Sequence, residues 1–230
     1  MRYGIINAMA EEKAALVAAM TDEKQTTIAG KLFHHGKIGN VDVVVVESGI
    51  GKVASALTTT LLITNFAVDA VINSGSAGAL GADLRIGDVV VASELAYADA
   101  DARAFGYVYG QVPQQPARFV TDEALSAGLA AVYGDVTDAR LVRGLIVTSD
   151  SFISGEEQKQ TILANFADAQ SAEMEGASIA QVAHYFDVPF AVVRAISDNA
   201  NGEASPTFDE FIVDAGKQSA QVLIDFFNKQ

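Results

Sequence analysis

The chain has 230 residues, of which 50% are hydrophobic and 19% charged, a composition that excludes a disordered protein and supplies enough apolar side chains for a sizeable core. Cysteine is absent from the sequence, which excludes disulfides, thiolate nucleophiles and cysteine-ligated zinc and is compatible with a reducing, cytoplasmic location. The formal net charge of −14, spread along the chain, disfavours nucleic acid and anionic membranes as partners.

The first half of the chain alternates short β-branched runs with helical patterns, and no apolar run is long enough to span a membrane. In chain order, the sequence predicts a strand over Tyr3–Ile6, a helix over Met9–Met20, a hairpin of Leu32–Ile38 and Val41–Glu47 turning at Gly39-Asn40, a helix over Gly51–Phe66, and strands over Ala70–Asn73 and Asp88–Leu95.

The second half continues the alternation. It predicts a helix over Asp122–Tyr133, a strand over Leu141–Val147, a helix capped by Ser154 and Glu157, a helix over Ala177–Phe186, a buried strand over Phe190–Ile196, and a last helix capped by Thr207 and Glu210. Strands that alternate with helices favour one α/β domain over residues 1–230, with a central, mixed but mostly parallel twisted sheet flanked by helices.

Two glycine-rich segments match known motifs only loosely. Gly49–Ala54 fits the dinucleotide-binding spacing, but it opens the second α/β unit instead of the first, which disfavours NAD. Asn73–Gly78 lacks the G-x-S-x-G spacing of a nucleophile elbow, and no histidine falls at a strand end. The histidines and acids show no metal-binding spacing either, so we expect neither a metal nor a cofactor.

Three carboxylates fall where strands end or helices begin, which is where open α/β sheets bind ligands. Glu12 follows the first strand, Glu175 lies at the start of a helix, and Asp198 ends the apolar run of the last strand. An acid at the end of a buried strand needs a partner or a ligand, because burying its charge alone costs several kcal/mol. Converging carboxylates suit the hydrolysis of a glycosidic bond, in which one protonates the leaving group and another activates water.

The motifs as a set resemble the 5′-methylthioadenosine/S-adenosylhomocysteine nucleosidases. The matching segments occur in that family's order and cover nearly the whole chain: Gly4–Glu12, Glu47–Ala54, Asn73–Gly78, Phe105–Tyr107, Ser149–Gly155, Glu173–Ala177, Val193–Asp198 and Phe208–Phe211. The resemblance implies a nucleoside phosphorylase-like fold and hydrolysis of the N-glycosidic bond of methylthioadenosine and adenosylhomocysteine, with release of adenine.

The same resemblance implies the roles of individual residues. Asp198 would protonate purine N7, Glu12 would activate water, and Glu175 would hold the ribose hydroxyls. The other implied contacts surround the base, the ribose, the attacking water and the 5′-alkylthio group, and they are Met9, Ile50, Ser76, Gly78, Phe152, Ile153, Met174, Arg194, Ser197 and Phe208. A homodimer is implied as well, in which Ala102, Phe105 and Pro113 would reach the site from the partner subunit.

Several alternatives stay open at this point. Phe152 and Met9 could belong only to the core, and Ser76 could serve only a turn. Ala102 stands where relatives often have a larger apolar residue, which leaves the width of the 5′ pocket undetermined. The function could also be that of a phosphate-dependent purine nucleoside phosphorylase, a non-catalytic nucleoside-binding protein, or a hydrolase of another 5′-substituted nucleoside such as futalosine. The acids Glu11 and Glu12 in the first βα turn favour hydrolysis, because they would repel phosphate.

Overall fold

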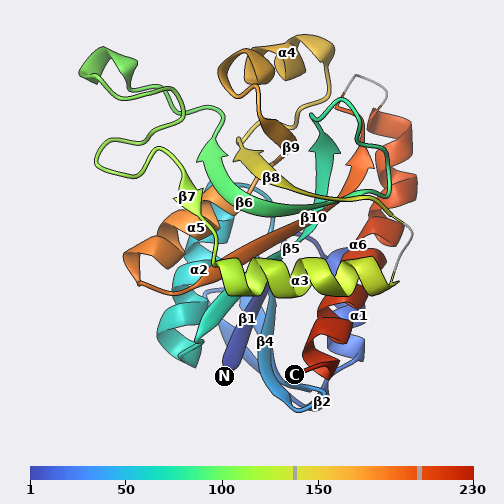
Figure 1. Cartoon of the computed structure of the whole chain (residues 1–230). Coiled ribbons are helices and arrows are strands. Elements are labelled where there is room, and N and C mark those ends of the chain that lie inside the picture. Colours follow the sequence, from blue (N-terminus) through green and yellow to red (C-terminus); the bar gives the residue numbers. More distant parts are fainter. Residues whose placement is uncertain (137–138, 201–203) are drawn as a thin grey trace.

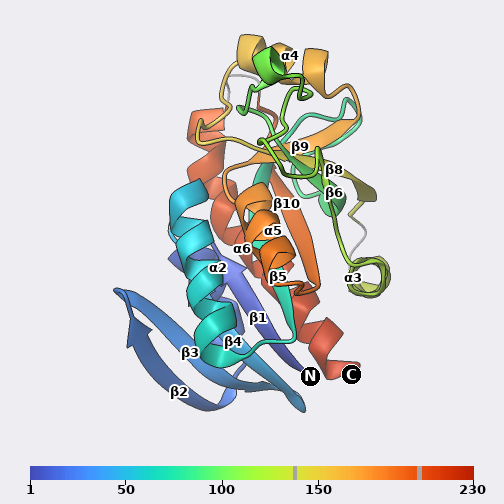
Figure 2. The same ribbon diagram turned by 90° about the vertical axis from the view of Figure 1, so that its left-hand side faces the viewer.

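Strands lie at the centre of the molecule and helices cover both faces of their sheet (Figures 1 and 2). The structure is a computed structural model that describes residues 1–136, 139–200 and 204–230, without the side chains of 134–136, 204–212 and 215. The strands are β1 (Arg2–Asn7), β2 (Thr21–Ile28), β3 (Lys31–Ile38), β4 (Val41–Glu47), β5 (Ala70–Ala79), β6 (Val89–Tyr97), β7 (Phe119–Val120), β8 (Leu141–Thr148), β9 (Ala169–Glu173) and β10 (Phe190–Asp198). The helices are α1 (Ala10–Ala18), α2 (Lys52–Phe66), α3 (Glu123–Val136), α4 (Glu156–Asn165), α5 (Gly176–Tyr185), α6 (Ala204–Asn228) and the short 3₁₀ helix η1 (Arg103–Phe105).

The centre of the sheet is parallel. Strand β1 pairs in parallel with β4 and β5, and β5 pairs in parallel with β10. Strands β6, β8 and β9 are parallel to one another and join the centre through the antiparallel pairs β6–β10 and β9–β5. Strands β5, β10, β6, β8 and β9 therefore close into a ring, while β3 and β2 extend the sheet beyond β4 in antiparallel fashion. The mixed, mostly parallel sheet expected from the sequence is confirmed.

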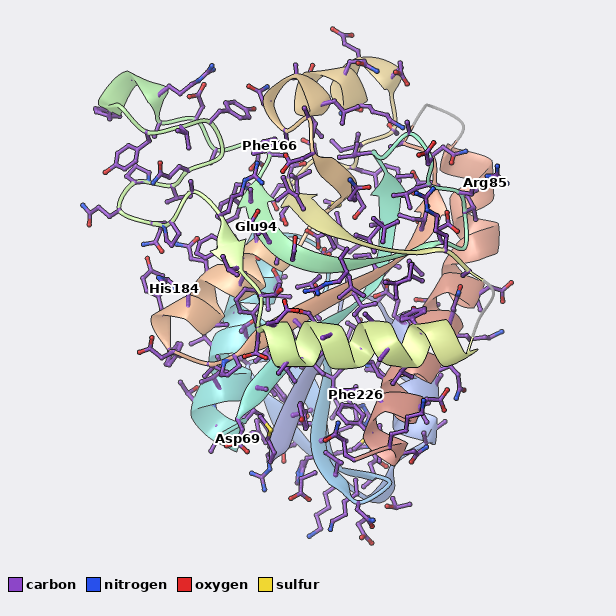
Figure 3. The ribbon with its side chains drawn as sticks, viewed as in Figure 1. Asp69, Arg85, Glu94, Phe166, His184 and Phe226 are labelled. Atoms are coloured by element: carbon purple, nitrogen blue, oxygen red, sulfur yellow. The ribbon has the colours of Figure 1, made fainter. Side chains whose placement is uncertain are left out.

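Two core clusters lie on opposite faces of the sheet, and a third lies where α4 packs on β8 and β9. On β4, Val44 and Val46 pack with α2 and α5, whereas Val43 and Val45 pack with α1, α3 and α6. Figure 3 shows Phe226 of α6 below α3, where its ring meets Tyr3 of β1 edge-on at 6.2 Å between centroids. Because both faces of the central strands are covered, their sequences are mostly apolar, with buried polar residues such as Asn73 and Arg194 among them. None of the helices that the structure describes is long and apolar enough to cross a membrane.

Some element boundaries differ from the prediction. Strands β2, β7 and β9 were not expected, and β5 continues six residues past Asn73, because it pairs there with β10 and β9. The two predicted capping boxes are wrong. Gly155, not Ser154, is the N-cap of α4, and it makes no side-chain cap, while α6 begins at Ala204 and contains Thr207.

Candidate active site

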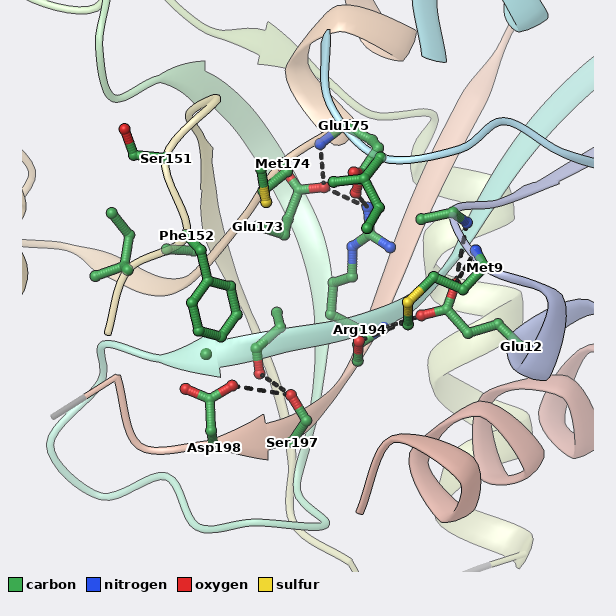
Figure 4. Close-up of a pocket in the computed structure, with 17 residues that line it drawn as sticks. Met9, Glu12, Ser151, Phe152, Glu173, Met174, Glu175, Arg194, Ser197 and Asp198 are labelled. Carbon is green, nitrogen blue, oxygen red and sulfur yellow. Dashed lines mark hydrogen bonds and ion pairs between the residues drawn. The ribbon is translucent and has the colours of Figure 1, made fainter. Parts of the chain in front are cut away.

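One cavity gathers the predicted residues at the carboxyl ends of β1, β5, β9 and β10 (Figure 4). It holds an empty volume of about 620 Å³, including its opening to solvent. Figure 4 shows Phe152 and Asp198 at one end, Met9 and Glu12 at the other, and Arg194 between them. The lining residues that the sequence predicted are Met9, Glu12, Ile50, Ser76, Gly78, Phe152, Ile153, Met174, Glu175, Arg194, Ser197 and Asp198.

Glu12 is a buried carboxylate held by four donors. Its Oε2 atom accepts the N–H groups of Ala8 and Met9 at 3.0 and 3.2 Å, in the pattern of half a capping box. Its Oε1 atom accepts the N–H and the hydroxyl of Ser76 at 3.1 and 3.2 Å. Burial raises the pKa of Glu12, and the positive charge of Arg194 offsets this rise in part. The result is a carboxylate with a fixed orientation and an increased affinity for a proton, as a general base needs.

The backbone of Gly75 explains how a carboxylate and a guanidinium come together here. A Cβ atom at this position would lie 2.9 Å from Glu12 Oε1 and would also overlap Nη1 of Arg194. Only glycine therefore lets both side chains lie against β5. Gly216 of α6 leaves room for Glu12 from the other side, because a Cβ there would lie 3.1 Å from the Cα atom of Glu12.

Arg194 is fully buried on β10 and is surrounded by acceptors. Its Nη2 atom donates to Asn73 Oδ1 at 2.5 Å and to Glu173 Oε2, and it lies 3.6 Å from Glu175 Oε2. A buried cation needs such partners, because the cost of removing it from water is otherwise not recovered. Among the described residues, four carboxyl groups line the cavity with this one cation, those of Glu12, Glu173, Glu175 and Asp198, so the cavity is acidic.

Glu173 and Glu175 are neighbouring acids with different surroundings. Glu173 accepts the hydroxyl of Thr148, the side chain of Arg194 and the N–H groups of Glu175 and Gly176, the last two at 3.0 and 2.7 Å. Glu175 accepts one backbone N–H, from residue 51 at 2.9 Å. Burial and the negative charge of Glu173 raise the pKa of Glu175. Glu173 thus accepts four hydrogen bonds from within the protein, whereas Glu175 keeps acceptor capacity for a ligand.

A β-bulge aims the last acid at the cavity. The pairing of β10 with β5 skips Ser197, so that Ser197 and Asp198 both line the cavity although they are consecutive. The hydroxyl of Ser197 donates to Asp198 Oδ2 at 3.0 Å, and the N–H of Ala200 donates to Oδ1 at 2.9 Å. Opposite, a Cβ atom at Gly78 would lie 3.0 Å from Oδ1. Asp198 is therefore buried, held from two sides and given room by a glycine.

The apolar lining lies toward the opening. Phe152 is 46% exposed and Ile50 58% exposed, and both line the cavity, so the interpretation of Phe152 as a core residue is wrong. Ser76 lies within β5 and not in a turn. Met9 and Met174 add two thioether side chains to the wall. Flexible, polarisable side chains of this kind fit an apolar group without hydrogen bonds.

Comparison with known proteins identifies the family. The phosphorylase superfamily model matches residues 2–228. A 5′-methylthioadenosine/S-adenosylhomocysteine nucleosidase of Shewanella pealeana is 48% identical over 97% of this chain and 97% of its own length. The chain belongs to this nucleosidase family. Two solved structures agree, each with a TM-score of 0.95: a candidate methylthioadenosine nucleosidase of Weissella paramesenteroides, 83% identical over 100% of this chain and 98% of that one, and the Streptococcus pneumoniae nucleosidase with the transition-state inhibitor MT-ImmA, 46% identical over 99% of both chains.

The family resemblance seen in the motifs is thereby confirmed. The residues that the nucleosidase motifs placed on a partner subunit do not line this cavity. Ala102, Phe105 and Pro113 belong to the segment between β6 and β7, which extends away from the sheet at the upper left of Figure 1. Phe105 is 82% exposed there, whereas Ala102 is buried. The predicted contact Phe208 has a side chain outside the described residues.

Among the charged residues that line the cavity, Glu173 is the one for which the sequence predicted no role. It stands in the family motif, two residues before Glu175, but nothing in the sequence separates the roles of the two acids. The available signal was its place just before a helix, where an acid can accept the first free N–H groups. The structure adds its second partner, Arg194, which is 21 residues further along the chain.

Proposed function

We propose that this chain hydrolyses the N-glycosidic bond of 5′-methylthioadenosine and S-adenosylhomocysteine and releases adenine. The observation that supports this most strongly is the pairing of two buried carboxylates at opposite ends of one cavity, Asp198 for the leaving group and Glu12 for water. The relatives described above, which are named for this activity, support the same substrates.

Asp198 is proposed to protonate N7 of the purine. A purine anion is a poor leaving group, and a proton at N7 makes the departing adenine neutral. The hydroxyl of Ser197 and the N–H of Ala200 hold both carboxylate oxygens and thereby fix the acid against the base. The half-exposed ring of Phe152 lies at the same end of the cavity, where it can stack on the purine, and the backbone of Ile153 can read the adenine edge.

Glu12 is proposed to accept a proton from the attacking water. Ser76 and Arg194, which contact or face this carboxylate, would place the water against the anomeric carbon. Glu175 would accept the ribose hydroxyls with the lone pairs that the protein leaves unused, and Met174 would pack on the sugar. Positive charge that builds on the ribose in the transition state would be stabilised by the excess of carboxylates in the cavity.

The 5′ substituent would bind along the apolar lining toward the opening of the cavity. Met9 and Ile50 line this part, and Phe208 is proposed to join them. A thioether gains from dispersion and desolvation but makes no strong hydrogen bond, so such a wall suits it.

Hydrolysis is favoured over phosphorolysis because the N–H groups at three helix N-termini are already hydrogen-bonded to side chains. Such termini bind phosphate through free N–H groups. At α1 the N–H groups of residues 8 and 9 are bound to Glu12, and at α2 those of residues 51 and 52 are bound to Glu175 and Asp150. At α5 the N–H groups of residues 175, 176 and 177 are bound to Glu173 and Thr148. A phosphate would have to displace carboxylates at each of these positions.

A substrate panel tests the proposal. The purified chain is incubated with methylthioadenosine, adenosylhomocysteine, adenosine and futalosine, with and without phosphate, and the free base is measured. We expect adenine from the two thioether nucleosides at equal rates with and without phosphate. A strict need for phosphate, with ribose 1-phosphate as product, would establish the phosphorylase instead. Binding without turnover would establish a nucleoside-binding protein, and preferential cleavage of futalosine would change the substrate.

We also propose a homodimer in which Phe105 and Pro113 complete the partner's site. Exposed apolar side chains support it: Phe105 is 82%, Val108 57% and Val53 82% exposed, and surfaces of this kind are commonly covered by another subunit. Sedimentation velocity at micromolar concentration should give twice the 24.1 kDa chain mass. A monomer that retains full activity under the same conditions would refute the shared site.

A further inference from the structure

Lys159 connects helix α4 to the ends of two strands beside Asp198. Its Nζ atom donates to the carbonyl oxygen of Ala79 at 2.9 Å and to that of Asn199 at 3.1 Å. Ala79 is the last residue of β5, and Asn199 directly follows the last residue of β10. One ammonium group therefore joins three segments that are far apart in the sequence.

The two carbonyl groups lie just beyond the point where β5 and β10 pair with each other, although Ala79 still pairs with Ser171 of β9. The pairing of β5 with β10 ends at Gly78 and Asp198. Past this point neither strand provides the other with a backbone donor. The hydrogen bond to the Ala79 carbonyl is partly buried, so this group needs a donor from the protein, whereas Asn199 is exposed and its carbonyl is also open to water. Lys159 is partly buried, and its ammonium supplies a charged donor to both, which makes these hydrogen bonds stronger than neutral ones.

The carbonyl of Asn199 belongs to the same turn that holds the acid. The next residue, Ala200, donates its N–H to Asp198 Oδ1 at 2.9 Å. Ala200 is fully buried and has a φ of 52°, a left-handed conformation that a residue with a Cβ adopts only when its surroundings enforce it. Because Lys159 binds the peptide that leads into Ala200, it contributes to holding this turn in place.

The other end of the connection is the wall that faces Asp198. Lys159 lies in the first turn of α4, where its N–H donates to the carbonyl of Gly155 at 3.1 Å. Phe152 and Ile153, which line the cavity, lie just before that turn. Lys159 therefore fixes the acid-bearing turn and the Phe152–Ile153 segment relative to one another, while it does not itself line the cavity.

We propose that Lys159 is a positioning residue for proton transfer from Asp198: through the carbonyl groups of Ala79 and Asn199 it keeps the acid at the correct place relative to the segment that binds the purine. This role rests on the proposed function. It differs from a purely structural role in one respect, namely that the effect of Lys159 on turnover must depend on the presence of a functional acid at position 198.

A double-mutant cycle tests this dependence. In Lys159→Met, which keeps most of the apolar stem and removes the ammonium group with both of its hydrogen bonds, we expect kcat for adenine release to fall about tenfold, with KM nearly unchanged. In an Asp198→Asn background the same change should alter single-turnover rates by less than about twofold, because the step it supports is already lost. In a Glu175→Gln background the tenfold effect should remain.

Three further variants control the experiment. Lys159→Arg keeps the donors and should restore kcat to near the wild-type value. Gln160→Met alters the exposed neighbour, whose amide donates to Glu156 of the same helix, and should leave kcat unchanged. If Lys159→Met does not fold, the same double-mutant cycle is measured with Lys159→Gln, whose amide is a neutral donor on a side chain shorter than that of lysine.

The outcomes distinguish a failure of the proposed function from a failure of the role of Lys159. Wild-type protein that releases no adenine would overturn the proposed function and this role with it. Wild-type turnover together with a wild-type kcat in Lys159→Met would overturn the role of Lys159 alone. An equal loss of rate in the Asp198 and Asp198→Asn backgrounds would do the same, because Lys159 would then act only on general stability.

Discussion

Asparagine in place of Asp198 should lower kcat for adenine release by about 10²- to 10⁴-fold, the usual contribution of a general acid. The amide has the shape of the carboxyl group, its oxygen can still accept the N–H of Ala200, and the hydroxyl of Ser197 can rotate to accept from its nitrogen. It cannot deliver a proton to N7, so adenine must leave as an anion, at a cost of roughly 3–5 kcal/mol in the barrier. Steady-state kinetics give the loss of rate. Calorimetry with adenine should give a Kd within about threefold of the wild-type value, because the asparagine amide keeps the shape of the carboxyl group and its hydrogen bonds.

A matched variant shows whether the loss belongs to the acid. Asp187 is exposed, lies outside the cavity and has a φ of 52°, which asparagine tolerates, so Asp187→Asn should keep the wild-type rate. The defect in Asp198→Asn should also become smaller with a nucleoside whose base leaves more easily without protonation. Wild-type rates in Asp198→Asn would remove the leaving-group role.

Much of the fold could be predicted because its central strands are buried on both faces. Apart from Arg194, the runs Val41–Glu47 and Phe190–Ile196 are apolar at every buried position, and this is visible without knowledge of the partners. Strand β2 could not be found in the same way. Its sequence is Thr-Asp-Glu-Lys-Gln-Thr-Thr-Ile, and almost every residue is exposed, so pairing with β3 alone makes it a strand. Tertiary contacts decide such cases and leave no local pattern.

The site was predictable to the extent that strand ends indicate ligand sites. Glu12, Glu175 and Asp198 could be selected from their positions, and the structure places them around one cavity. The different roles of Glu173 and Glu175 could not be predicted, because they depend on how many hydrogen-bond donors reach each carboxylate. Those donors include Thr148 and Arg194, at 25 and 21 residues from Glu173 in the sequence. The role of Lys159 could not be predicted either, because its acceptors are backbone carbonyl groups, which leave no trace in the sequence.

Glutamine in place of Glu12 should lower kcat by about 10²- to 10⁴-fold with little effect on nucleoside binding, because the amide cannot take a proton from water. The pH dependence provides a second signature. Burial raises the pKa of Glu12, and the base works only when it is ionised, so wild-type kcat should fall as the pH drops through this raised value. The residual rate of Glu12→Gln should lack that fall. Measuring kcat across the acidic range for both proteins tests the two statements together.

The neighbouring acid provides the control for Glu12. Glu11 is exposed on the same turn of α1, and Glu11→Gln should keep both the wild-type rate and its acidic limb. A nucleophile that needs no base adds a test that separates the two carboxylates. Azide can attack the anomeric carbon directly, so it should partly restore adenine release in Glu12→Gln, with a ribosyl azide as the other product. It should not restore Asp198→Asn, where the leaving group still departs without a proton. Equal rescue of both variants, or of neither, would contradict the assignment of Glu12 to water and Asp198 to adenine.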